Sequence, residues 1–281
     1  MDKNFEKVSE NARLEATFKL SRIQLRENRI NPKNFKDCPG FSNEKIDIDI
    51  AKAEKLKNRF DEKGKEDPEN QRARDFGEFL EFIINEQVEL GNWLGDNVLT
   101  YPASEIDDYE AGVDSVAEIL EDDSETSHFA LAMDATIGGD SVTKLRRIKD
   151  EIDGGELGGI KYFHSERTGF KGSLKNVARV VVAVDGETIK ELASMWMSGD
   201  KKGLNSHKVQ FQILKEIILQ AEVFRDYASR VGKEEIAEQY GDLAERMQKI
   251  YDQKIQTAEV EMDDFDSAYN ALKFNLKIFE D

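Results

Sequence analysis

The chain has 281 residues, of which 35% are charged and 39% hydrophobic, and its net charge is −18. This composition is typical of a helix-rich protein with one sizeable domain and extensions, or with two domains, and no apolar run approaches the roughly 18 residues of a membrane span. A single cysteine excludes an internal disulfide, so we expect a cytoplasmic protein.

Helical spacing dominates the first 90 residues. Apolar residues recur at intervals of three and four and predict helices over 4–29 and 42–60. The charged stretch 61–70 contains a glycine and a proline, which predicts a linker. A strongly amphipathic helix follows over 72–90. We therefore predict a helical N-terminal extension that occupies residues 1–70.

Two short strands are predicted next, over 112–119 and 128–136. The acidic segment between them has the composition of a hairpin loop. The second strand is apolar apart from Asp134, and a carboxylate in a buried strand needs a partner. If the strands pair as a hairpin, Asp114 and Asp134 converge at one end of the sheet.

Two carboxylates held close together repel each other unless a proton or a cation lies between them. Hard oxygen ligands of this kind suit Mg²⁺ or Mn²⁺. Asp114 and Asp134 are therefore candidate metal ligands. The alternative is that each acid caps a turn or a helix, which is a common role for aspartate.

Strands and helices alternate after this hairpin. The strand expected at 179–186 is nearly all β-branched and fits a central buried position. A helix is predicted on either side of it, at 141–152 and 188–197, and a short strand at 159–164. This order predicts a mixed α/β core over residues 71–204.

The remaining segment, 205–281, is predicted to be a helical C-terminal region. Apolar residues at helical spacing form one face over 209–228 and another over 236–250. Such faces are typical of a core or of a homodimer interface. The segment 232–281 is also acidic, with thirteen acids against six bases.

The central strand pair resembles the core of the PD-(D/E)xK nuclease superfamily, which has the restriction-endonuclease-like fold. In that family an Asp on one strand and an Asp/Glu-x-Lys on the next bind Mg²⁺ at a scissile phosphate. Asp114 matches the first acid, Asp134 the second, and Ala135 the position whose backbone carbonyl is also a metal ligand. The sequence departs from the family at Thr136, where the family has lysine. The resemblance covers residues 72–197.

The resemblance implies that a lysine from elsewhere completes the site, and Lys144 and Lys161 are the candidates. A lysine beside the metal stabilises the charge that develops on the phosphate and orients the attacking water. A strand holds a side chain more rigidly than a helix start, which favours Lys161. The family's first core helix sometimes supplies a glutamate to the metal, here Glu78 or Glu86. A solvated surface position is the alternative for each of these side chains.

A net charge of −18 repels nucleic acid on average, but the charge is unevenly distributed. Residues 161–179 contain five bases and one acid, which predicts a surface for the nucleic-acid backbone, with DNA preferred to RNA. The five predicted phosphate-binding residues are Lys161, Arg167, Lys171, Lys175 and Arg179.

These residues together predict a Mg²⁺-dependent phosphodiesterase that acts on nucleic acid. Two alternatives stay open. The first is a catalytically inactive version of the same fold, which Thr136 and the net charge favour. The second is an unrelated α/β protein without chemistry, which binds its partners through the acidic C-terminal helices.

Overall fold

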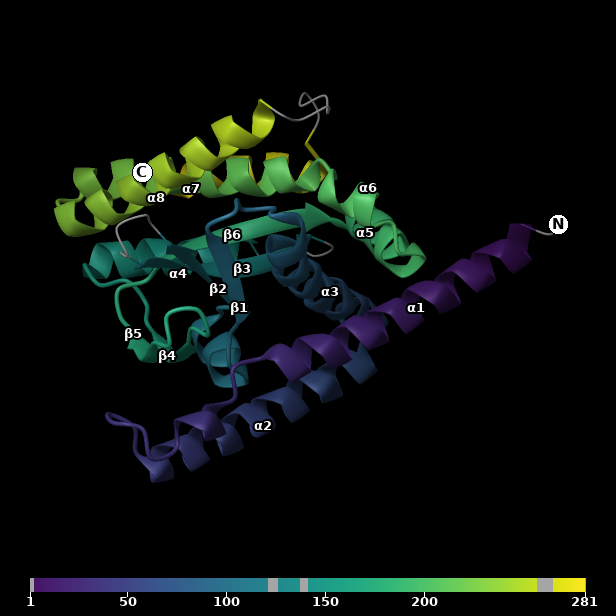
Figure 1. Cartoon of the computed structure of the whole chain (residues 1–281), viewed down its shortest axis with the longest axis horizontal. Helices are drawn as coiled ribbons and strands as arrows, with labels where there is room; N and C mark the ends of the chain where they lie inside the picture. The colour runs from purple at the N-terminus through teal and green to yellow at the C-terminus, as the bar shows by residue number, and fades with distance from the viewer. Residues whose placement is uncertain (1–2, 121–125, 137–140, 257–264, 281) are drawn as a thin grey trace.

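A computed structural model shows a mixed α/β protein with helical regions at both ends of the chain (Figure 1). The structure describes residues 3–120, 126–136, 141–256 and 265–280. Four stretches within these ranges have a described backbone but no described side chains: 3–10, 65–66, 126 and 130–136.

Three long helices open the chain, namely α1 (Lys3–Asn28), α2 (Asn43–Glu66) and α3 (Pro68–Gly91). The predicted linker at 61–70 is wrong, because only Asp67 separates α2 from α3. The Asp67 side chain caps α3 by accepting hydrogen bonds from two backbone N–H groups of its first turn. The proline that follows fits the first helical position, where a missing N–H costs nothing.

The central sheet has four strands in the order β1-β2-β3-β6. Its first three strands, β1 (Val98–Pro102), β2 (Ser115–Leu120) and β3 (Thr126–Thr136), form an antiparallel meander. The fourth, β6 (Ala178–Asp185), lies parallel to β3. The predicted hairpin of the second and third strands is confirmed. Strand β1 is not evident in the sequence, because it is short and ends in a proline.

The connection from β3 to β6 crosses through α4 (Ser141–Gly154) and a small second sheet. That sheet pairs β4 (Ile160–His164) antiparallel with β5 (Lys171–Leu174). It lies between the central sheet and α2 (Figure 1). A helix between two parallel strands is the usual way to make such a connection.

Six further elements follow β6 and make up the C-terminal region. They are α5 (Gly186–Ser198), α6 (Lys201–Asn205), α7 (Val209–Arg230), α8 (Glu234–Ile255), α9 (Ser267–Asn275) and the short turn η3 (Leu276–Phe279). None of the helices in the described ranges combines the length and apolar character that crossing a membrane requires.

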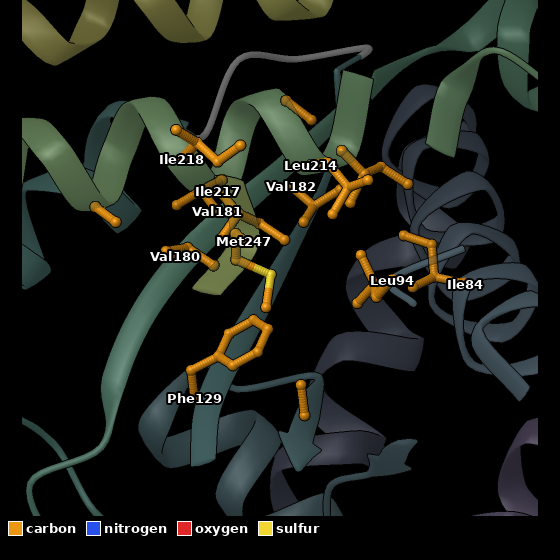
Figure 2. Close-up of a cluster of buried hydrophobic side chains, with 14 of the residues drawn as sticks. Ile84, Leu94, Phe129, Val180, Val181, Val182, Leu214, Ile217, Ile218 and Met247 are labelled. Atoms are coloured by element: carbon orange, nitrogen blue, oxygen red, sulfur yellow. The ribbon is translucent and has the colours of Figure 1, made fainter. Parts of the chain in front are cut away.

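The main core forms where α7 packs on β6. Figure 2 shows Val180 and Val182 of β6 near Leu214 and Ile217 of α7, with Phe129 on β3 close by. All five side chains are buried. The apolar face of α7 that the sequence assigns to a core or a homodimer interface therefore lies against the sheet.

The outer edge of β6 pairs with side chains of α7 instead of a further strand. Gln220 accepts a hydrogen bond from the Val181 N–H (2.8 Å) and donates one to the Val181 carbonyl (2.6 Å). Two residues along β6, the Ala183 N–H donates to Glu216 (2.9 Å) and the Ala183 carbonyl accepts from Gln212 (3.0 Å). The three polar residues stand four apart on one helix face and satisfy a buried strand edge.

Candidate functional site

Asp114 lies directly before β2, at the exit of a tight turn. The turn η2 (Asp107–Ala111) is π-helical and ends at Gly112, whose φ of 61° places it in the left-handed region that favours glycine. The Gly112 N–H donates to the Asp108 carbonyl (2.8 Å), and the Ala103 N–H donates to the Asp114 carbonyl (2.9 Å). These bonds fix the backbone at both Asp108 and Asp114.

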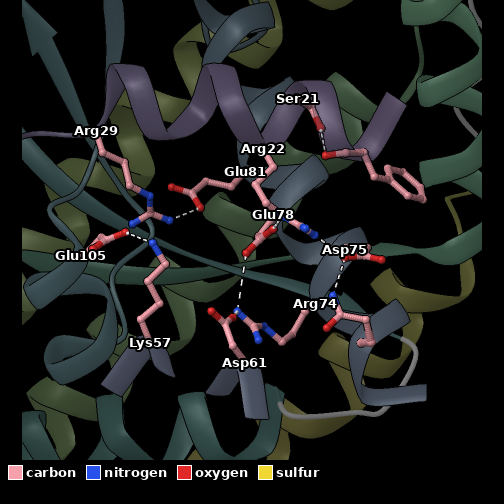
Figure 3. A network of polar contacts seen from close by, with 12 residues as sticks. Ser21, Arg22, Arg29, Lys57, Asp61, Arg74, Asp75, Glu78, Glu81 and Glu105 are labelled. Carbon is pink, nitrogen blue, oxygen red and sulfur yellow. Dashed lines mark hydrogen bonds and ion pairs between the residues drawn. The ribbon is translucent and has the colours of Figure 1, made fainter. Parts of the chain in front are cut away.

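Three carboxylates gather around one guanidinium at this turn. Arg29 Nη2 lies 2.7 Å from Glu81 Oε2, and Arg29 Nη1 lies 2.9 Å from Asp108 Oδ2. Figure 3 shows the pair of Arg29 and Glu81 between α1 and α3. Asp114 lies within electrostatic reach of all three groups. The Glu81 side chain is only 3% exposed and that of Arg29 only 10%.

Burial disfavours the charged forms of these acids. It raises the pKa of Glu81 well above its usual range; the charge of Arg29 opposes the shift, and Asp114 and Asp108 add to it. Burial likewise raises the pKa of Asp108 to about 7, against the opposing charge of Arg29. Burial thus outweighs the charge of Arg29 at both Glu81 and Asp108, and these two acids hold a proton more readily than a solvated carboxylate does.

Glu81 and Asn85 of α3 each have a buried oxygen that accepts no hydrogen bond from any described residue. One is Glu81 Oε1, and the other is Asn85 Oδ1, one turn further along α3. The Asn85 amide donates instead to Ser115 Oγ (2.8 Å) and to the Glu81 carbonyl (2.7 Å), which ties α3 to the start of β2. A buried acceptor without a donor costs about 1–3 kcal/mol. Carboxylate and amide oxygens are the types of ligand that a hard divalent cation prefers.

Asp134, Ala135 and Thr136 lie in the last three positions of β3. Ser115 pairs with Leu131, and Asp134 follows Leu131 by three residues, so Asp114 and Asp134 lie at the same end of the sheet. The side chains of these β3 positions lie outside the described residues. Their convergence on one ion therefore stays a prediction.

The two α3 glutamates expected at the metal have other partners. Glu78 forms an ion pair with Arg22, and Glu86 accepts a hydrogen bond from the Trp196 indole (3.0 Å). Glu81 is the α3 glutamate at the cluster. Glu81 could have been found in the sequence from its place inside the apolar run 79–84, because a buried carboxylate is costly unless it has a partner.

Of the two candidate lysines, Lys144 lies within electrostatic reach of the cluster. It is in the first turn of α4, and its charge lowers the pKa of Asp108. Lys161 pairs instead with Asp49, and its backbone N–H donates to Asp107 Oδ1 (2.7 Å). The structure thus places Lys144, and not Lys161, near Asp108, and the choice of catalytic lysine stays a prediction.

Of the five predicted phosphate-binding residues, one is buried, and the other four are exposed on or beside the β4–β5 hairpin. Arg179 is buried and faces Glu151 at 3.5 Å, which removes it from any contact with a nucleic-acid backbone. Lys171 lies over the Phe35 ring, 5.2 Å from its centroid. The other three are Lys161 at Asp49, Arg167 in the turn between β4 and β5, and Lys175 after β5.

Another buried acid, Glu118, has a structural role. It accepts hydrogen bonds from Ser165 (2.7 Å) and Tyr101 (3.1 Å) and lies 3.3 Å from His128 Nε2. These contacts join the first three strands to the loop after β4. The fully buried Ser165 has no access to a substrate, so the group is not a nucleophilic site.

Within the described ranges, no three histidine, cysteine, aspartate or glutamate side chains are arranged to hold a metal ion. Glu81 and Asp108 are both bonded to Arg29, and the Asp134 side chain lies outside those ranges. Comparison with models of known protein families, with curated proteins and with solved structures finds no match.

The raised pKa of Asp108 predicts that the folded state loses stability as the pH rises from about 4 to 7. An unfolded aspartate titrates near pKa 3.9, so between these values the folded chain binds more protons than the unfolded one. The loss is on the order of 2–4 kcal/mol. Asp108→Asn has no such proton to lose, so its free energy of unfolding, measured in urea at pH 5 and pH 8, changes less than that of the wild type. If the free energy of unfolding changes equally between pH 5 and pH 8 in both chains, the raised pKa of Asp108 is contradicted.

Proposed function

We propose that the chain is a Mg²⁺- or Mn²⁺-dependent nuclease with a restriction-endonuclease-like core. The observation that carries the proposal is Glu81 Oε1, a buried carboxylate oxygen within electrostatic reach of Asp114 that has no hydrogen-bond partner among the described residues. Buried polar atoms in native proteins almost always have a partner. As a ligand of a divalent cation, this oxygen would have one.

The order of the elements supports the same proposal. A helix that carries an acid (α3) precedes an antiparallel meander, in which Asp114 lies directly before β2 and Asp134 lies in the adjacent strand β3. The metal would be held by Asp114, Glu81 and Asp134, with the carbonyl of Ala135. When bound, it supplies Lewis-acid charge at the phosphate and lowers the pKa of a water.

The chain's own residues position these groups. Asn85 fixes α3 against Ser115, which holds Glu81 and Asp114 at a constant separation. Gly112 gives the turn the left-handed conformation that aims the backbone of Asp114 into β2. Lys144 brings a positive charge from α4, and its role is to stabilise the negative charge of a phosphate in the transition state.

Incubation with labelled DNA and labelled RNA tests the activity directly. We expect cleavage with Mg²⁺ or Mn²⁺ and none with EDTA, with DNA as the better substrate. Lys144→Ala should slow cleavage, and Lys161→Ala should leave it close to wild type. Intact DNA and RNA after incubation with a chain that demonstrably binds Mn²⁺ would exclude the nuclease.

The second candidate is an inactive nuclease-like module that acts by binding. Two observations favour it: Thr136 stands where the resembled family has lysine, and Arg29 already pairs with two of the cluster's acids. The acidic helix α8 then provides the binding surface. Binding of Mn²⁺ without cleavage of either nucleic acid selects this candidate.

A further inference from the structure

Arg29 belongs to the N-terminal helical arm (residues 3–66, with α1, η1 and α2) and not to the α/β core, yet its guanidinium lies among the acids of the candidate site. We propose that Arg29 is a displaceable internal cation. It pairs with Glu81 and Asp108 when no metal is bound, and it moves into an adjoining cavity when a divalent cation binds at Glu81 and Asp114. The inference rests on the metal site of the proposed function and adds a regulatory element to it.

Charge makes the two cations exclusive. Arg29 Nη2 lies 2.7 Å from Glu81 Oε2, so a divalent ion that binds the Glu81 carboxylate lies within a few ångströms of the guanidinium. Like charges at that distance repel strongly in a buried site, where water does not screen them. The acids that Arg29 holds are therefore unavailable to a metal until the side chain leaves.

A cavity of about 410 Å³ gives the side chain a place to go. It lies between the end of α1, the turn η1 (Pro32–Phe35) and α2, and Arg29 forms part of its wall. This volume easily accommodates a guanidinium and its stem. Three carboxylates in the wall, Glu27, Glu54 and Glu105, outnumber its two other cations, Arg26 and Lys33, and offer new partners. Glu105 is bonded only loosely to Lys57, at 3.5 Å (Figure 3).

The backbone of the arm has no need to move. On one side of Arg29, Phe18 packs against Phe76 and Phe79 of α3, with ring centroids 5.3 and 5.5 Å apart. On the other side, Asp49 of α2 accepts a hydrogen bond from the Tyr162 hydroxyl (2.6 Å). The arm is thus anchored to the core on both sides, and a rotation of the Arg29 side chain is sufficient for the change.

The affinity for Mn²⁺ tests this inference without an activity assay. Mn²⁺ is titrated calorimetrically into the wild-type chain, Arg29→Gln and Arg22→Gln. Arg22 is the matched control, because it also joins α1 to acids of α3, Asp75 and Glu78, but lies outside the cluster. We expect Arg29→Gln to bind Mn²⁺ more tightly by roughly tenfold, within the 5–150-fold range of ordinary coupling, and Arg22→Gln to match the wild type.

Arg29→Lys keeps the chain testable if Arg29→Gln does not fold, which a thermal melt reveals. A lysine carries one point charge and cannot hold two carboxylates in the geometry of a guanidinium, so Mn²⁺ affinity should lie between the other two values. Equal or weaker Mn²⁺ binding by Arg29→Gln overturns the inference and makes Arg29 a fixed structural partner. Tighter Mn²⁺ binding by Arg29→Gln without nuclease activity supports the inference about Arg29 and contradicts only the proposed function. No Mn²⁺ binding by any variant removes the metal site itself.

Discussion

If the chain is the proposed nuclease, we expect Asp114→Asn and Glu81→Gln each to reduce Mg²⁺-dependent cleavage of DNA by at least roughly a hundredfold, since the loss of a residue that only supports a metal ligand already costs 10–100-fold. Both substitutions keep the size of the side chain and remove its negative charge. The reason is the same for both: each deletes one of the acids at which the cation would bind. The measurement is kcat/KM at saturating Mg²⁺, with Mn²⁺ affinity as a second readout.

Asp75→Asn is the control for this pair. Asp75 is also a carboxylate of α3 bonded to an arginine of α1, but its partner is Arg22. Its replacement should leave the cleavage rate within about twofold, because the Asp75–Arg22 ion pair lies outside the cluster. Cleavage by Asp114→Asn or Glu81→Gln at the wild-type rate would falsify the assignment of the site. A thermal melt of each variant separates lost chemistry from lost folding.

Gln220→Ala destabilises the fold by about 2–5 kcal/mol, because it leaves both backbone groups of Val181 buried without partners, at about 1–3 kcal/mol each. Gln220 is fully buried, and it accepts from the Val181 N–H and donates to the Val181 carbonyl. Loss of its side-chain packing against the core adds to the effect. The measurement is the free energy of unfolding in urea.

The same substitution at an exposed position calibrates this value. Gln253 lies on the outer side of α8 and is exposed, so Gln253→Ala should change the free energy of unfolding by no more than about 0.5 kcal/mol. A loss below about 1 kcal/mol for Gln220→Ala means that water replaces the amide at the strand edge. The paired hydrogen bonds then do not define the packing of α7 on β6.

Local pattern was sufficient to predict the long elements. Helices α1, α2 and α3, the β2–β3 hairpin and the buried strand β6 all follow from spacing and β-branched composition. The predicted linker at 61–70 is wrong because Gly64 is accommodated inside α2 and Pro68 at the start of α3. The proline begins α3, and Asp67 before it supplies the cap.

Tertiary contacts decide the rest of the site, which is why the sequence did not reveal it. Asp114 is evident as an acid at a strand start, but its neighbours come from segments 33 and 85 residues earlier, at Glu81 and Arg29. Patterns within one segment do not predict that the end of α1 lies beside α3. The unusual position of Glu81 within an apolar run was the only local hint, and periodicity alone assigned importance to the wrong turns of α3.

The polar side chains along α7 have a consequence for how copies of this chain meet. An uncovered strand edge can pair with a strand of another molecule, which leads to fibres or to exchanged segments between molecules. The edge of β6 cannot pair in this way at Val181 and Ala183, because amide and carboxylate groups already bond to the backbone there. Growth of the sheet from this side first requires α7 to peel away, so self-assembly through it should accompany unfolding and not precede it.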